Sequence, residues 1–299
     1  MLEQTGSNFK KHINPAFIMD KLKFTKMHGN GNDFVLIDEY HGLKISENEK
    51  SKIVRAICHR HFGIGADGVL FVQQSKLADV KFRYFNKDGS EAEMCGNGIR
   101  CFSRYVVEEG YVKSTMFNVE TLAGILEIEV TRDENWWVKV EMGKPKFGKE
   151  QIPSEIEVWG CEFDFRDKKY TMFAVNTGVP HVVIFVDSLE FDIIPIARKI
   201  RYSEIFPEGV NVNFAKIEGR DKIRVRTYER GVESETLSCG TGSVAVAAVA
   251  KRLGLIRDKV EILTKGGPLK IELDDTAHMI GPANRVCDGF IRVCELYEV

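Results

Sequence analysis

The chain has 299 residues, with 42 Lys and Arg against 44 Asp and Glu, and 43% of its residues are hydrophobic. This length fits one large or two ordinary domains, and the balanced charge lacks the basic footprint of nucleic-acid binding. No apolar run approaches the roughly 20 residues of a membrane span, and cysteines without zinc-type Cys-x-x-Cys pairs suit a reducing cytosol. We therefore expect a cytoplasmic globular protein with no nucleic-acid, membrane or metal partner.

Regular patterning begins after residue 18, and residues 1–18 lack the apolar core of a signal peptide. We expect this segment to be a disordered extension. Apolar and polar residues then alternate as in a β-strand. This pattern is interrupted by a loop rich in Gly and Asn, and an apolar strand follows. This loop is either a plain hairpin turn or a binding loop that presents Asn32 and backbone N–H groups to a ligand. Helical spacing follows from Glu47 to His61, with Ser46 as the candidate N-cap.

The stretch from Phe82 to Val106 places a thiol at the beginning of a helix. A strand-like alternation of apolar and polar residues is followed by a polar turn and then by the sequence CGNG at residues 95–98. Apolar residues with helical spacing cover residues 99–109. Unpaired backbone N–H groups and the positive end of the helix dipole lie at such a position. A thiolate of Cys95 and a bound carboxylate are both stabilised there.

Strand patterns dominate from residue 119 onward, and Gly143 with Pro145 marks the expected crossing into a second half. Residues 155–186 indicate further strands, and a short helix is expected over residues 191–201. His181 opens an apolar strand directly after Pro180. A histidine there is either a satisfied core residue or a functional one, and the local pattern leaves both interpretations open.

The segment from residue 223 to 254 repeats the segment from residue 80 to 110 with one inserted residue. The match places CGTG at residues 239–242 on CGNG at residues 95–98, and it continues with Thr264 and Gly267 on Thr121 and Gly124. This period is far longer than that of solenoid repeats and indicates duplication of a whole half. Two similar halves usually pack about a pseudo-twofold axis, which would bring the two cysteines face to face.

The helices after the two cysteines differ in composition. Residues 243–250 are apolar on every side and must be buried, whereas residues 99–109 carry Arg100 and Arg104 beside aromatic side chains. We predict the α+β class, with two pseudo-symmetric domains that each wrap a curved, mostly antiparallel β-sheet around a central α-helix. One half comprises residues 19–144 plus 285–299 and the other residues 145–284. The last strand, residues 290–296, is expected to return to the sheet of the first half.

Two opposed thiols at helix starts admit three chemistries. A redox dithiol usually uses near neighbours, but here the partners come from different halves. A cysteine hydrolase needs one thiol with a histidine, and a second equivalent thiol serves no purpose there. A two-base racemase needs two acid/base groups on opposite faces of one carbon. This last chemistry explains the duplication, and the glycine-rich N–H groups would hold the substrate carboxylate and its developing charge.

The motifs MHGNGNDFVLID, HFGIGADGVLFV, FNKDGSEAEMCGNGIRCFSRY, PEGVNVNFAKI and YERGVESETLSCGTGS resemble those of diaminopimelate epimerase. The resemblance extends from about residue 23 to the end of the chain. It implies a cofactor-independent isomerase that interconverts LL- and meso-diaminopimelate, a small amino-acid substrate, in lysine and peptidoglycan biosynthesis. The implied fold has two domains of eight strands around a central helix.

The resemblance also implies roles for individual residues. Cys95 resembles the proton donor and Cys239 the acceptor for one direction, and His181 with Glu229 resembles the pair that assists thiol ionisation. The residues that match substrate contacts of the family are Asn32, Asn86, Gly96, Asn97, Asn211, Glu229, Arg230, Gly240 and Thr241.

Two positions depart from the family pattern: Val179 stands where an Asn is common, and Gly68 where some members have Gln. Loss of the amide at residue 179 would leave one polar group of diaminopimelate without its expected partner. The alternative function is therefore racemisation of a related amino acid, such as lysine, without pyridoxal phosphate. The sequence leaves the assembly open, with a homodimer as the candidate.

Overall fold

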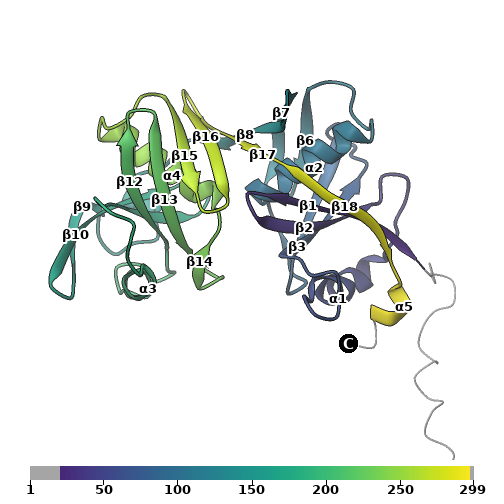
Figure 1. Ribbon diagram of the computed structural model, residues 1–299, viewed down its shortest axis with the longest axis horizontal. Coiled ribbons are helices and arrows are strands. Elements are labelled where there is room, and N and C mark those ends of the chain that lie inside the picture. Colours follow the sequence, from purple (N-terminus) through teal and green to yellow (C-terminus); the bar gives the residue numbers. More distant parts are fainter. Residues whose placement is uncertain (1–20, 297–299) are drawn as a thin grey trace, which may run out of the picture.

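A computed structural model describes residues 21–296, so the expected disordered extension over residues 1–18 lies outside the described residues. Two halves lie side by side, and strands β8 and β17 join them (Figure 1). None of the helices within residues 21–296 is long and apolar enough to cross a membrane.

The first half follows a regular pairing pattern. Its elements are β1 (Leu22–Gly29), β2 (Asn32–Asp38), α1 (Glu47–Cys58), β3 (Gly68–Gln73), β4 (Val80–Asn86), β5 (Glu91–Ala92), α2 (Gly96–Glu108), β6 (Met116–Thr121), β7 (Gly124–Arg132) and β8 (Trp136–Gly143). Strands β1, β2, β3, β4, β6, β7 and β8 pair in this order, antiparallel except for β2–β3 and β4–β6.

The second half repeats this pattern. Its elements are a 3-10 helix (Lys149–Gln151), β9 (Trp159–Phe165), β10 (Lys168–Asn176), β11 (Pro180–Phe185), α3 (Ile194–Arg201), β12 (Asn211–Gly219), β13 (Lys222–Glu229), β14 (Ser234–Thr236), α4 (Gly240–Arg252), β15 (Lys259–Thr264), β16 (Gly267–Leu273), β17 (Ala277–Pro282), β18 (Asn284–Ile291) and α5 (Val293–Leu296). Strands β10 to β17 pair as β1 to β8 do, with β11–β12 and β13–β15 parallel. The duplication inferred from the sequence is therefore present in the topology.

Matching turns give the two halves the same local geometry. Gly110 and Gly254 follow helices α2 and α4 with φ of 74° and 72°, a left-handed conformation that glycine adopts without strain. In the hairpins after these helices, the hydroxyl of Thr121 donates to Gly124 O at 2.8 Å, and that of Thr264 to Gly267 O at 2.8 Å. These are the residue pairs that the sequence repeat aligned.

Each central helix packs into the sheet of its own half. Helix α4 is buried over residues 242–250 and contacts strands β10 to β13 and β15 to β17, as its uniformly apolar sequence predicts. Helix α2 takes the equivalent place in the first half, and helices α1 and α3 pack in two further core clusters. The predicted α+β class, with one central helix in each half, is confirmed.

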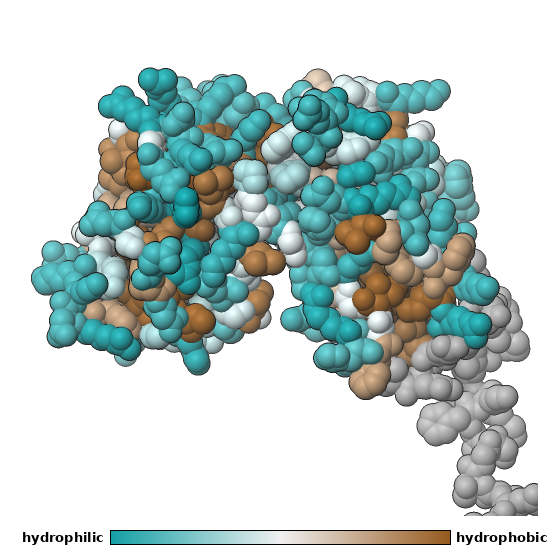
Figure 2. Space-filling model, viewed as in Figure 1, coloured by the Kyte–Doolittle hydropathy of each residue, from teal (hydrophilic) through white to brown (hydrophobic). Residues whose placement is uncertain are grey.

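The chain end differs from the prediction of a strand over residues 290–296. Strand β18 runs from Asn284 to Ile291 and pairs antiparallel with β1, and residues 293–296 form the short helix α5. The pairing stops because β1 begins at Leu22, the partner of Ile291. Leu296 then packs in the cluster around α1. Figure 2 shows hydrophobic side chains on the face that β18 crosses, where Phe290 is exposed.

Two predicted helices are shorter than expected. Helix α1 ends at Cys58 rather than His61, because the chain turns back at Gly63, where a Cβ would lie 2.1 Å from Ala56 O. Ser46 is its N-cap residue, although its side chain makes no capping hydrogen bond. Helix α3 begins at Ile194, with a proline in its first turn, rather than at residue 191.

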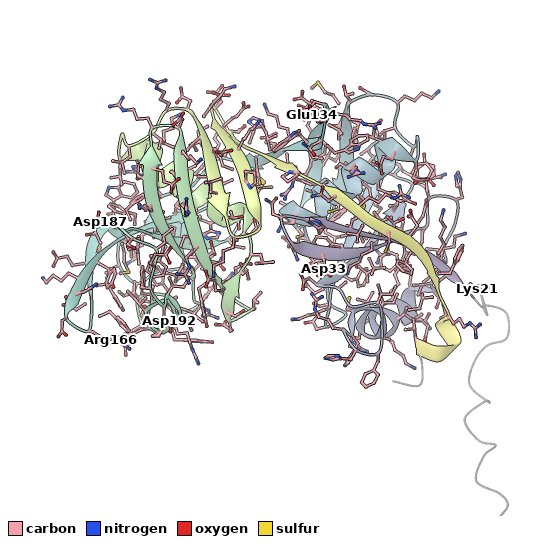
Figure 3. All side chains as sticks on the ribbon, viewed as in Figure 1. Lys21, Asp33, Glu134, Arg166, Asp187 and Asp192 are labelled. Atoms are coloured by element: carbon pink, nitrogen blue, oxygen red, sulfur yellow. The ribbon has the colours of Figure 1, made fainter. Side chains whose placement is uncertain are left out.

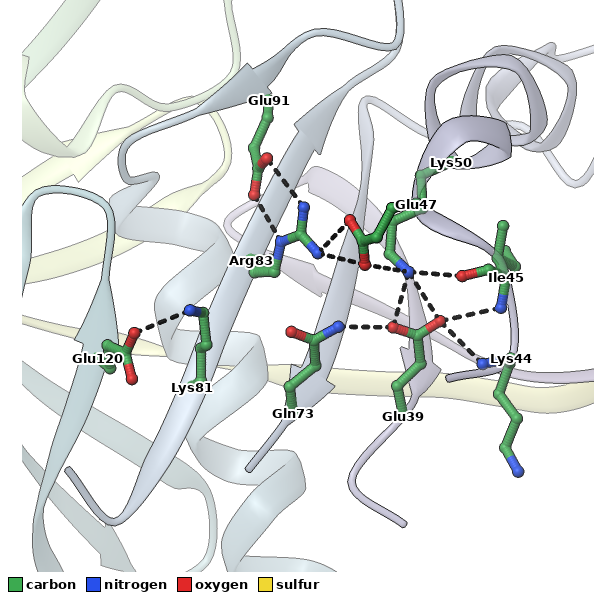
Figure 4. A network of polar contacts seen from close by, with 10 residues as sticks. All are labelled: Glu39, Lys44, Ile45, Glu47, Lys50, Gln73, Lys81, Arg83, Glu91 and Glu120. Atoms are coloured by element: carbon green, nitrogen blue, oxygen red, sulfur yellow. Dashed lines mark hydrogen bonds and ion pairs between the residues drawn. The ribbon is translucent and has the colours of Figure 1, made fainter. Parts of the chain in front are cut away.

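A buried polar network fastens α1 to the first sheet (Figure 4). Lys50 Nζ on α1 lies 2.9 Å from a carboxylate oxygen of Glu39, and both side chains are almost wholly excluded from water. Glu39 also accepts hydrogen bonds from the backbone N–H groups of Lys44 and Ile45 and from Gln73 Nε2. The full set of partners explains how a buried carboxylate and ammonium are tolerated.

Candidate active site

The two thiols occupy equivalent positions at the starts of the central helices. Cys95 is the N-cap residue of α2, and Cys239 is the N-cap residue of α4. Both helix starts meet at one side chain: a Cβ at Gly96 would lie 2.9 Å from Met279 Cε, and one at Gly240 would lie 2.9 Å from Met279 Sδ. The structure therefore brings both Cys-Gly motifs to the junction of the halves (Figure 1).

On the first side, Cys95 lies beside Asn32 and Asn97. The thiol is 3.8 Å from Asn32 Oδ1, which also accepts from Asn97 Nδ2 at 3.1 Å, and Asn32 Nδ2 donates to Asp67 at 2.8 Å. Asn97 is buried, and its Oδ1 has no hydrogen-bond partner. Burial raises the pKa of Cys95, while the backbone N–H groups of Gly98 and Asn97 lower it. The unpaired oxygen marks a place where a substrate donor would bind.

The loop that carries Asn32 is a hairpin turn and also part of the site. Asn30 and Gly31 have φ of 52° and 84°, the conformation of a two-residue hairpin, and Gly29 pairs with Asn32. Next to it, Asp33 lies on the side of the first half that faces the second half (Figure 3). Burial raises the pKa of Asp33, but hydrogen bonds from Arg60 and Lys26 lower it to about 2. The hairpin turn is therefore confirmed, and the binding role of Asn32 stays a prediction.

On the second side, a hydrogen-bonded chain runs from Cys239 to His181. The thiol is 3.4 Å from Thr241 Oγ1, which is 3.0 Å from His181 Nε2. Asn213 Nδ2 donates to Val182 O at 2.9 Å and faces His181 Nδ1 at 3.2 Å. A donor at Nδ1 requires that nitrogen to be unprotonated, so Nε2 carries the proton toward Thr241. The Thr241 hydroxyl is then free to donate to the Cys239 sulfur.

Glu229 lies beside Cys239 and its charge reaches both thiols. Burial raises the pKa of Glu229, whereas hydrogen bonds from Thr236 and from the Cys239 thiol lower it. Burial and the neighbouring Glu229 in turn raise the pKa of Cys239. At the same time Glu229 raises the pKa of Cys95. A carboxylate that accepts a hydrogen bond from a thiol is placed to take its proton.

The remaining predicted contacts fall into two groups. Asn211 bridges the backbone by donating to Pro180 O and accepting from Arg230 N–H at 2.8 Å, and Arg230 Nη1 donates to Glu208 O at 3.1 Å. The charge of Arg230 reaches His181, so this pair borders the Cys239 side. Asn86 instead bonds to Ser90 within its own turn. Among residues 21–296, Asn86 has no hydrogen bond to another predicted site residue.

Three residues of the network were missed by the sequence reasoning: Asp67, Asn213 and Thr236. Asn213 is fully buried within the alternating run VNVNF, on β12, and the alternation places its side chain inward. A buried amide needs partners, so its position in this run could have predicted a polar contact. No comparable signal in the sequence indicates Asp67 or Thr236.

The two departures at residues 68 and 179 have different structural settings. A Cβ at Gly68 would lie 2.5 Å from both Phe85 O and the ring of Tyr84, so Tyr84 leaves no room for a side chain there. Val179 is half-buried directly before β11, the strand that carries His181.

His181 gives a prediction for stability against acid. It is fully buried, and burial together with the charge of Arg230 lowers the pKa of His181 from 6.5 to about 3. Between these values the unfolded chain binds a proton that the folded chain does not. Stability from this residue is therefore lost as pH falls below 6.5, by up to about 1.4 kcal/mol per pH unit. Urea unfolding of His181→Gln should show a shallower acid loss, and the exposed His61→Gln should match the parent protein.

Comparison with known proteins agrees with this geometry. The family model of diaminopimelate epimerase matches residues 24–148 and 173–286. A diaminopimelate epimerase of Archaeoglobus fulgidus is 69% identical over 281 residues, 93% of this chain and 100% of the relative. One from Methanothrix thermoacetophila is 54% identical over 91% of this chain and 97% of the relative.

Solved structures with low sequence identity share the fold. A hydroxyproline epimerase from Agrobacterium vitis has a TM-score of 0.66 at 15% identity, covering 91% of this chain and 93% of that protein. A PhzF-family phenazine biosynthesis protein from Bacillus anthracis has a TM-score of 0.66 at 17% identity, covering 91% and 99%. The fold defines a class of two-domain α+β proteins. Within this class, the chain belongs to the diaminopimelate epimerase family.

Proposed function

We propose that Cys95 and Cys239 carry out the reaction of this protein, epimerisation of diaminopimelate, by two-base proton transfer. The reaction itself follows from the family match and from the curated relatives. The observation that supports this mechanism is that the two helix starts directly after the N-cap cysteines, at Gly96 and Gly240, both lie against Met279, in two halves of the same topology. Two bases on opposite faces of one carbon allow a proton to leave one face and return on the other.

The substrate would bind with its α-carbon between the two sulfurs and its α-carboxylate at the helix starts. There the free N–H groups of α2 and α4 donate to the carboxylate and stabilise the charge that develops when the α-proton leaves. One cysteine, as thiolate, removes the α-proton, and the other, as thiol, delivers its own proton to the opposite face. Each turnover exchanges the protonation states of the two thiols, and proton exchange with solvent restores them before the next turnover in the same direction.

Glu229 and His181 support the thiol on the second side. Glu229 takes the Cys239 proton when Cys239 serves as the base, and the hydroxyl of Thr241 donates to the resulting thiolate. His181 acts through Thr241, because its Nε2 orients that hydroxyl. We place this chemistry in the cytoplasm, where reducing conditions keep both thiols free.

Isotope exchange tests the proposed substrate. We expect the purified protein in deuterated water to incorporate deuterium at the α-carbon of LL-diaminopimelate and to form the meso isomer. L-Lysine under the same conditions should be labelled at least about tenfold more slowly, because it lacks the distal carboxylate. Proton NMR of both substrates measures the rates. Equal labelling of lysine would replace this proposal with the racemase alternative that Val179 suggests.

A further inference from the structure

Arg100 is a buried cation at the junction of the two halves. It lies on α2, five residues after Cys95, and its side chain is 0% exposed. Its guanidinium donates to Gly96 O at 3.1 Å and to Asn30 Oδ1 at 2.7 Å within the first half, and to Pro282 O at 3.2 Å in the second. The sequence places Arg100 beside aromatic side chains on this helix, and its pattern alone did not indicate that the arginine is buried.

The slot around the guanidinium is shaped for it. A Cβ at Gly29 would lie 2.9 Å from Arg100 Nη2, and one at Gly281 would lie 2.7 Å from Arg100 Nε. Glycines from the first half and from β17 thus leave the space that the planar group fills. Neither glycine has a positive φ, so close packing rather than a turn accounts for glycine at both positions: Arg100 and Asn97 O lie against Gly29, and Leu269 and Arg100 against Gly281.

No carboxylate within residues 21–296 forms an ion pair with this buried charge. Burial lowers the pKa of Arg100 to about 10, and the opposing influences come from two cysteines, Cys101 and Cys95. An unpaired buried charge is expensive, so a chain with no use for it would place an apolar side chain there. Of the two cysteines, Cys95 is the one at a free helix start, where a thiolate is also stabilised by N–H groups.

The second half lacks an equivalent charge. The sequence repeat that aligns Cys239 with Cys95 aligns Val244 with Arg100, and Val244 is fully buried in the core around α4. The thiol of Cys239 instead has the carboxylate of Glu229 beside it. Cys95 therefore has a nearby buried cation that Cys239 lacks, although the backbones of the two halves match and the charge of Glu229 reaches both thiols.

We propose that Arg100 is a positioning residue for the reaction, whose guanidinium holds the Cys95 loop and serves as the countercharge of the Cys95 thiolate. This inference rests on the proposed role of Cys95 as one of the two bases. It assigns the thiolate of the resting protein to Cys95 and the thiol to Cys239. The side chains that interact electrostatically with Cys95 include Tyr84, Arg100, Cys101, Glu229 and Cys239.

The test measures alkylation of each cysteine by iodoacetamide as a function of pH, without substrate, with peptide mass spectrometry resolving the sites. In Arg100→Met, the pH of half-maximal Cys95 alkylation should rise by about one unit or more, since an opposite charge typically favours an ionised group by that amount. In Arg100→Lys, which keeps the positive charge, the pH of half-maximal Cys95 alkylation should stay close to that of the parent protein. Cys239 in the same samples should show a smaller change.

Controls separate this role from simple packing. Arg104→Met removes a cation from the same helix, where Arg104 is already paired with Glu108, and should leave the Cys95 profile unchanged. Arg100→Gln, which keeps hydrogen-bond donors without charge, replaces the Met variant if that variant does not fold. An unmoved Cys95 profile in the neutral variants would overturn the inference, even if activity fell. Because alkylation needs no turnover, this failure is distinct from failure of the two-base mechanism, which Cys95→Ala tests.

Discussion

Replacing either Cys95 or Cys239 with alanine should abolish epimerisation and leave the fold intact. Each thiol serves one face of the α-carbon, and general acid/base groups typically contribute about 10²–10⁴-fold. Both side chains lie at helix starts in the junction between the halves, so removing a sulfur deletes a small part of either core. Turnover and circular dichroism of the two variants check this. Cys287→Ala, at an exposed position on β18, should keep full activity.

Hydrogen exchange makes this test more specific. A variant with one thiol left still has a base on one face, so it should exchange the α-hydrogen of one stereoisomer slowly without inverting it. Because the thiols serve opposite faces, Cys95→Ala and Cys239→Ala should label opposite stereoisomers. Near-normal epimerisation by either variant, or labelling of the same isomer by both, would contradict the two-base mechanism.

The sequence predicted the features that follow from duplication and pattern. The repeat of Cys95 in Cys239 predicted two equivalent helix starts, and the apolar run of α4 predicted a buried helix inside a sheet. These predictions succeed because periodicity and glycine turns are local properties of the chain. The domain boundaries at residues 144 and 284 stay predictions.

Long-range contacts were beyond the sequence patterns. Arg100 is buried because Asn30 and Pro282, distant in the sequence, complete its slot, and a helical pattern carries no record of such partners. From the sequence alone, Lys50 would likewise be expected at the surface. The structure buries it because Glu39 lies against it as its ion-pair partner. The chain end forms α5 after the pairing of β18 with β1 ends at Ile291 and Leu22.

His181 shows the limit most clearly within the site. Its apolar surroundings on β11 fit a core histidine, and the structure does bury it completely. Its contacts with Thr241 and Asn213 come from two other elements, which hold its ring beside Cys239. Burial therefore does not exclude the predicted role of His181, and the local sequence pattern could not show these contacts.

We expect the second large effect at Arg230, whose proposed role is to bind the distal carboxylate of the substrate. Its Nη1 donates to Glu208 O and Gly209 O, and its charge reaches His181. Within residues 21–296 no carboxylate forms an ion pair with it, so its guanidinium is available to a substrate carboxylate. Arginine binds such a group through two parallel N–H bonds, which lysine does not reproduce.

Arg230→Ala should therefore lower kcat/KM for diaminopimelate by about 10- to 150-fold, the range of about 1.5–3 kcal/mol for a hydrogen bond to a charged group. Arg230→Lys should recover part of the loss. In Arg230→Ala, any slight activity on the substrate L-lysine should fall much less, because that substrate has no distal carboxylate. Arg224→Ala is the matched control and should have no effect, because Arg224 is an exposed arginine on β13, the strand that ends just before Arg230, and is paired with Glu218. Val179→Asn should improve diaminopimelate binding or leave it unchanged. Equal losses on both substrates in Arg230→Ala would show that Arg230 supports the site as a whole and does not read the distal carboxylate.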